Sequence, residues 1–211
     1  DLFNDAANAG RFGIFTYDNW NVMHMCMRSG FDPFAERTAD DADKFGETAN
    51  KWFNNAKLKT DDMGAINTAL VNGEIDFYCT GGTYTASPAR LEGVTNIRGI
   101  TPRSGPSNGK GGVVWVEVTS LVNNPNLSSL GVEFLKYINE PEASYRVAMA
   151  EGTHNPVAQM GNPEVLSQFS TDELEALQYD SLNEDISRCV DYNIIPGYDQ
   201  LREIYGRALR S

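Results

Sequence analysis

The chain has 211 residues, with 17 Lys and Arg against 29 Asp and Glu, which gives a formal net charge of −12 at pH 7. A hydrophobic fraction of 41% supports a buried core and argues against intrinsic disorder. The excess of acids disfavours nucleic acid and anionic membranes as partners, because phosphates are neutralised by Lys and Arg, and it is compatible with a cationic ligand.

Short apolar segments alternate with amphipathic ones along the chain, a pattern that predicts an α/β fold. Before residue 101, we expect strands at 11–17, 75–79 and 96–100, and helices at 20–28, 39–56, 60–73 and 83–93. Asp18 precedes the first helix as a candidate N-cap, and Gly30 follows it as a candidate stop. Thr60 and Asp61 are expected to open the third helix.

The second half of the chain begins with a Gly-, Pro- and Ser-rich segment at 101–112, which predicts a surface loop. After it we expect a strand at 113–118, helices at 128–139, 141–151, from 171 onward and at 198–210, and an extended crossover at 154–157. Pro141 and Gly152 stand at positions that favour the start and the end of a helix, and Ser170 with Glu173 forms a capping box.

The residues that most often carry catalysis or bind metals are few and scattered. The histidines are His24 and His154, and the cysteines are Cys26, Cys79 and Cys189, none in a metal-binding spacing. No nucleophile motif or phosphate-binding loop is present, and no apolar run approaches the roughly 18 residues of a membrane span. We therefore disfavour an enzyme and expect no metal and no cofactor.

Aromatic residues occur beside acids at two places. Tyr17, Asp18 and Trp20 fall at an expected strand-to-helix junction, and Trp115 and Glu117 lie two apart on an expected strand, so they face the same side. Aromatic faces and carboxylates together bind organic ammonium groups, and ligands of α/β sheets sit at the carboxyl ends of strands. The alternative is structural, with Trp115 in the core, Glu117 solvated and Asp18 a cap, and the pattern alone favours it.

Three stretches carry a resemblance to a known family. They read GRFGIFTYDNWNVMHMCMRSGF, MGAINTALVNGEIDFYCTGGTY and GGVVWVEVTSLVNNPNLSSLGVEFLKYINEPEASYRVAMAEGTHNPV. Through them the chain resembles periplasmic solute-binding proteins of ABC transporters, specifically the spermidine/putrescine-binding type. The similarity extends over nearly the whole chain, and the third stretch is the most specific.

The resemblance implies a type II periplasmic-binding-protein fold, with a mixed sheet flanked by helices. It assigns 1–114 to the first part of lobe two, 115–160 to an excursion into lobe one, and 161–211 to the C-terminal helices of lobe two. It also implies that the signal peptide and the N-terminal part of lobe one are absent from this chain. The missing segment, or a second copy of the chain, is then expected to cover the apolar faces of 115–160.

The resemblance also implies a set of ligand-binding residues. Trp115 and Glu117 match the stacking aromatic and the acid that the family places two apart on the strand after its Gly-Gly pair. The remaining positions that match the family's contacts, with some offset, are Tyr17, Asp18, Trp20, Tyr84 and Arg188.

The implied function is capture of a small amine-bearing solute between two lobes, followed by delivery to an ABC permease in the membrane. The implied location is the periplasm, or the outer face of a membrane. One alternative is a binder of the same fold for an amino-acid derivative or an organic anion, in which Arg188 or Arg103 would matter more than the acids. A further, less favoured alternative is an enzyme on this fold.

Overall fold

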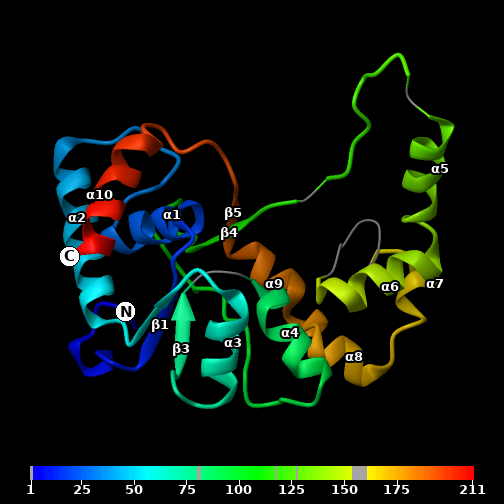
Figure 1. The fold of residues 1–211 in the computed structure, drawn as a ribbon, viewed down its shortest axis with the longest axis horizontal. Helices are drawn as coiled ribbons and strands as arrows, with labels where there is room; N and C mark the ends of the chain where they lie inside the picture. Colours follow the sequence, from blue (N-terminus) through cyan, green and yellow to red (C-terminus); the bar gives the residue numbers. More distant parts are fainter. Residues whose placement is uncertain (1, 80–81, 117, 127, 154–160) are drawn as a thin grey trace. The chain divides into compact units, whose positions relative to one another are not determined.

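The structure is a computed structural model and describes residues 2–79, 82–116, 118–126, 128–153 and 161–211. It is a mixed α/β protein, in which small parallel sheets are flanked by helices (Figure 1). The chain forms two compact units. Unit 1 comprises Asp1–Gly81, Thr101–Val114 and Glu184–Ser211, and unit 2 comprises Gly82–Ile100 and Trp115–Asn183.

The larger sheet belongs to unit 1 and has three parallel strands. β1 (Phe12–Phe15) lies in the middle, between β2 (Leu58–Thr60) and β3 (Phe77–Cys79). Gly13 sits at the centre of β1, where an added Cβ would lie 2.8 Å from the Cδ1 atom of Ile75, so only glycine fits without a shift. Because all three strands run the same way, their carboxyl ends meet at one edge of the sheet.

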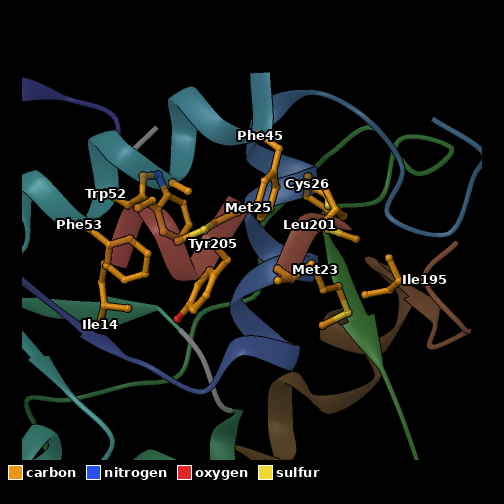
Figure 2. Close-up of a cluster of buried hydrophobic side chains, with 14 of the residues drawn as sticks. Ile14, Met23, Met25, Cys26, Phe45, Trp52, Phe53, Ile195, Leu201 and Tyr205 are labelled. Carbon is orange, nitrogen blue, oxygen red and sulfur yellow. The ribbon is translucent and has the colours of Figure 1, made fainter. Parts of the chain in front are cut away.

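Three helices build the core of unit 1 around this sheet. They are α1 (Asp18–Ser29), α2 (Ala39–Asn55) and α10 (Tyr198–Arg210), and α10 packs against both of the others (Figure 1). Figure 2 shows their buried side chains meeting above Ile14 of β1. The fully buried members that the figure labels are Ile14, Met23, Met25, Cys26, Phe45, Trp52, Phe53 and Leu201. Burial of apolar surface on this scale is the main stabilising term.

The helix ends in unit 1 follow local sequence signals, with two corrections. The prediction that Thr60 and Asp61 open the third helix was wrong, because Thr60 ends β2 and α3 (Met63–Val71) has Asp62 as its N-cap. Gly30 closes α1 in the left-handed conformation at φ 93°, as predicted. Thr38 and Asp41 form a reciprocal capping box at the start of α2. The prediction that Asp18 is the N-cap was wrong: the cap is Tyr17, without a side-chain hydrogen bond, and Asp18 is the first residue of the helix.

Unit 1 also contains a second sheet, which has two strands. β4 (Gly112–Val114) pairs in parallel with β5 (Cys189–Asp191). The strand predicted at 113–118 therefore ends at Val114, and Trp115 and residue 116 continue without strand pairing. The prediction of a mixed sheet was also wrong for the described strands, whose pairings are all parallel.

Unit 2 contains short helices and a small core. The helices that lie in it are α4 (Thr83–Leu91), α5 (Ser129–Tyr137), α6 (Pro141–Glu151), α7 (Pro163–Leu166), α8 (Thr171–Ala176) and the 3₁₀ turn η2 (Tyr179–Ser181). Their core consists of Ala148, Val165, Phe169 and Leu177. Of the remaining elements, the 3₁₀ turn η1 (Ala6–Asn8) lies near the N-terminus and α9 (Leu182–Ser187) precedes β5.

The segment 96–100 was predicted to be a strand and is not one. Its backbone is satisfied by a side chain instead: the Gly99 amide donates to Oε1 of Gln178 at 2.7 Å, and the Gly99 carbonyl accepts from Nε2 of the same residue at 3.0 Å. Gln178 is 1% exposed. A buried amide therefore takes the place of a neighbouring strand, which an apolar pattern in the sequence does not predict.

The two units divide the chain differently from the lobes implied by the resemblance. Both divisions change after Val114, but residues 82–100 and 161–183 belong to unit 2 in the structure. The assignment of 1–114, 115–160 and 161–211 to lobes of a larger protein stays a prediction. Among the described residues, no helix combines the length and the apolarity needed to cross a membrane.

Leu201 of α10 is fully buried in the core of unit 1. Replacing it with Ala is expected to lower the free energy of unfolding by about 2–5 kcal/mol, because it removes buried methyl groups and leaves a cavity. Urea denaturation followed by circular dichroism measures this. The control is Gln200→Ala at the exposed neighbouring position, which should change stability by no more than about 0.5 kcal/mol. Equal effects of the two substitutions would contradict the packing described.

Candidate solute site at the end of strand β1

An open hollow of about 480 Å³ lies in unit 1, where β1 and β2 end. Its lining residues are Phe15, Thr16, Tyr17, Asp18, Asp61, Arg202, Tyr205, Gly206, Leu209 and Arg210. They come from the ends of two neighbouring parallel strands, the start of α1 and one face of α10. The carboxyl edge of a parallel sheet is the common position of ligand sites in α/β proteins.

A buried hydrogen-bond network holds the wall of this hollow in place. The hydroxyl of Tyr205 donates to the carbonyl of Thr16 at 3.1 Å and accepts from Nδ2 of Asn21 at 2.9 Å. The same Nδ2 donates to the carbonyl of Phe15 at 2.6 Å. Burial raises the pKa of the Tyr205 phenol, so the group stays protonated. The network ties the last carbonyls of β1 to α1 and α10.

An ion pair joins the first residue of α1 to α10. Nε of Arg202 lies 2.5 Å from Oδ2 of Asp18, and the Tyr198 phenol interacts with the same carboxylate. Burial, followed by the nearby charge of Asp18, raises the pKa of Tyr198 to about 12. The hydrogen bond that Arg202 donates to Asp18 also raises the pKa of the Arg202 guanidinium. The carboxylate predicted to bind a ligand cation therefore already holds a cation of the protein.

Two further charged residues line the hollow without an ion pair among the described residues. Asp61 directly follows β2 and is exposed, and Arg210 belongs to the last turn of α10 and is exposed too. An acid and a guanidinium of this kind are available to a solute because no ion pair within the described chain has to be broken first.

The aromatic residues predicted in unit 1 are adjacent but differ in role. Tyr17 lines the hollow and is 48% exposed, with its ring centroid 6.5 Å from that of Trp20. Trp20 packs on the core of unit 1 and contacts Tyr192, at 6.2 Å between ring centroids, and does not line the hollow. Of these two residues, Tyr17 is the one placed to stack on a solute in the hollow.

A second aromatic pair lies within unit 2. The rings of Tyr84 and Trp115 meet edge to face, with centroids 6.4 Å apart and an interplanar angle of 88°. An added Cβ at Gly82 would come within 3.2 Å of the Tyr84 ring and 3.9 Å of the Trp115 ring, so glycine leaves room for both. The structure thus brings together two residues that were predicted separately as stacking groups.

The other two predicted site residues do not join either group. Arg188 makes ion pairs with Glu184 and with Asp185, the latter at 3.8 Å, and does not line the hollow. This position does not support a role in ligand binding, because two nearby acids already form ion pairs with Arg188. Glu117 lies outside the described residues.

Sequence reasoning missed Asp61, Arg202, Tyr205 and Arg210 as site residues. Asp61 was interpreted as part of a helix start, because the three-residue strand before it is too short to give a pattern. For α10 a signal was present: Arg202 and Arg210 are spaced eight residues apart, which places them on one helix face.

The candidate catalytic groups lie elsewhere or outside the described residues. His24 is on α1 and does not line the hollow; burial, together with Arg28 one turn away, lowers its pKa to about 4. All three cysteines are in the described part of the chain and are free thiols, and burial raises the pKa of Cys26 to about 12. In the described ranges, no group of three His, Cys, Asp or Glu side chains could hold a metal ion. His154 lies outside them.

No model of a known protein family matches the chain, and no curated protein matches it as a relative. The resemblance to polyamine-binding proteins therefore stays a prediction.

The coupling between Asp18 and Arg202 can be measured by a double-mutant cycle. With Asp18→Asn, Arg202→Gln and the double variant, urea denaturation is expected to give an interaction free energy of about 0.2–1 kcal/mol, the range for a largely solvated ion pair. Raising the ionic strength should reduce it. Strictly additive effects of the two substitutions would show that the pair does not hold Arg202 in place.

The lowered pKa of His24 predicts an acid-side loss of stability. The ordinary value is 6.5 and the folded value about 4, so between these pH values the unfolded chain binds more protons. Stability therefore falls as the pH drops through this window. His24→Gln should reduce the difference in unfolding free energy between pH 7 and pH 4.5, measured by urea denaturation. An unchanged difference would contradict the burial of the neutral imidazole.

Proposed function

We propose that the chain is the solute-capturing component of an ABC import system, with a type II periplasmic-binding fold. It binds a small amine-bearing solute and passes it to a permease in the membrane, working in the periplasm or on the outer face of a membrane. The resemblance supports this proposal, and the parallel sheets flanked by helices are compatible with it.

The observation that carries the proposal is the open hollow at the carboxyl edge of β1 and β2, with Asp61 and Tyr17 in its lining. A carboxylate forms charge-assisted hydrogen bonds with an ammonium group, and an aromatic face attracts a cation. Together they supply the two interactions that amine recognition needs. The hollow is large enough for a solute of a few heavy atoms and open enough to admit it.

The structure changes which acid is proposed to bind the amine. Asp18 is held by Arg202 and Tyr198, so an approaching ammonium would have to displace an arginine. Asp61 has no such partner in the described chain and lines the same hollow. We therefore assign the amine to Asp61, stacking to Tyr17, and a supporting role to Asp18.

The residues of unit 2 keep their predicted roles as part of the proposal. Tyr84 and Trp115 present a pair of aromatic rings, and Glu117 is the acid expected next to them from the resemblance. In two-lobed binding proteins, ligand contacts bias a hinge motion toward the closed state. Import by this chain is proposed to use that motion.

The test is a binding screen on the whole chain by thermal shift and calorimetry, with a length series of primary amines and diamines. A binding amine raises the melting temperature, because it stabilises only the folded state. Asp61→Asn is expected to weaken binding by about tenfold or more, as a hydrogen bond to a charged group is worth about 1.5–3 kcal/mol.

The control is Asp43→Asn, which removes the same charge from an exposed position of α2 that does not line the hollow. It should leave binding unchanged. If no amine raises the melting temperature, or if the two substitutions weaken binding equally, the proposed site is wrong.

A further inference from the structure

We infer that the solute of this hollow carries a carboxylate or a similar anionic group besides its amine, and that Arg210 and Arg202 bind this group above Gly206. The inference rests on the proposed function and narrows its solute class to zwitterions with separated charges. The amine is bound by Asp61, and the anionic group lies against α10.

Three residues of α10 that line the hollow have a regular spacing along the helix. Arg202, Gly206 and Arg210 lie four residues apart, so they form one row on a single face of the helix, and all three line the hollow. Glycine is the residue between the two arginines. The row therefore places two guanidinium groups on one face of the helix, and the residue between them has no side chain.

Gly206 lies inside a helix, where glycine is less favourable than alanine, and its backbone is not in the left-handed region. An added Cβ would approach Nη1 of Arg210 to 3.3 Å and Nη2 to 3.8 Å. Gly206 thus lowers the stability of the helix at the position where the Arg210 guanidinium lies against the backbone.

The Arg202 guanidinium has N–H donors that its contact with Asp18 does not use. Asp18 engages Nε of Arg202, and within the described chain the Nη1 and Nη2 atoms of this residue make no hydrogen bond. A guanidinium has five N–H donors in a rigid fork, so fixing one edge orients the others. Asp18 is in this way a positioning residue for Arg202.

Acids and bases are present in equal number in the lining of the hollow. Asp18 and Arg202 neutralise each other, which leaves one acid, Asp61, and one base, Arg210. This pair complements one ammonium and one carboxylate in the same solute. A diamine would instead place its second cation among the arginines, which is unfavourable.

Basic residues near the end of a helix also interact favourably with the helix dipole, which is an ordinary reason for an arginine at 210. Arg207 shares that reason, since it lies in the same last turn. It does not line this hollow but lines an adjoining one, whose lining also includes Arg202, Gly206 and Arg210. Arg207 is therefore the matched control for a binding role of Arg210.

The experiment compares three probe series of matched chain length on the whole chain: ω-amino carboxylates from glycine to 6-aminohexanoate, the corresponding diamines, and the corresponding monocarboxylates. Calorimetry gives the dissociation constants. At least one ω-amino carboxylate is expected to bind more tightly than the diamine and the monocarboxylate of its length. Arg210→Gln should weaken its binding by about tenfold or more, and Arg207→Gln should leave it unchanged.

Gly206→Ala provides a second test that is independent of folding defects. It favours the helix and so should not lower the melting temperature, yet its Cβ would lie 3.3 Å from Nη1 of Arg210, so the guanidinium has to shift by a few tenths of an ångström. Binding of the ω-amino carboxylate should fall while the diamine series is unaffected. Retained affinity in this variant would contradict the placement of the anionic group.

The outcomes separate this inference from the proposed function. Binding of diamines without binding of any ω-amino carboxylate overturns the inference and leaves an amine-binding site. Binding of monocarboxylates alone overturns the amine site and keeps the arginine pair. Equal losses in Arg210→Gln and Arg207→Gln overturn the role of Arg210, and the absence of binding in all three series overturns both proposals.

Discussion

The hollow depends on one buried contact, the hydroxyl of Tyr205 bridging the Thr16 carbonyl and the Asn21 amide. Thr16 and Asn21 lie at the end of β1 and in α1, which follow each other in the chain, whereas Tyr205 belongs to α10, more than 180 residues later. Leaving a buried hydrogen-bonding group without a partner costs about 1–3 kcal/mol, so the contact fixes where α10 crosses the strand end. That position in turn decides which face of α10 meets the hollow, and hence that Arg202 and Arg210 line it.

The charges follow from this packing. An acid at the first turn of a helix is favourable by itself, and Asp18 has this position in α1. In the folded chain, Arg202 of α10 donates a hydrogen bond to Asp18. The carboxylate therefore holds Arg202 in place and is not free to bind a ligand cation. The unengaged charges are then those of Asp61 and Arg210. A chain with a net charge of −12 thus presents a locally balanced site.

The sequence predicts the helices with strong patterns and caps, and it fails where a tertiary contact replaces a local one. The bounds of α6 and α10 agree with the prediction, since Pro141 and Gly152 mark the ends of α6 and an apolar stripe marks α10. The strand expected at 96–100 fails because the side chain of Gln178 satisfies its backbone. Of the candidate site, Tyr17 and Asp18 were found from the junction of strand and helix. The partner of Asp18 was not, because Arg202 is 184 residues away and only the folded chain brings it near.

The proposed solute site lies at the carboxyl edge of β1, between the end of β2 and α10. The most direct test is a titration of the ¹⁵N-labelled chain with 4-aminobutanoate, followed in two-dimensional ¹H–¹⁵N spectra. Saturable shifts are expected for the amides of residues 16–18, 61 and 202–210, and the amides of α6 and α8 should stay unchanged. Saturable shifts confined to unit 2, or no saturable shift at millimolar concentrations of this probe, would contradict the proposed site.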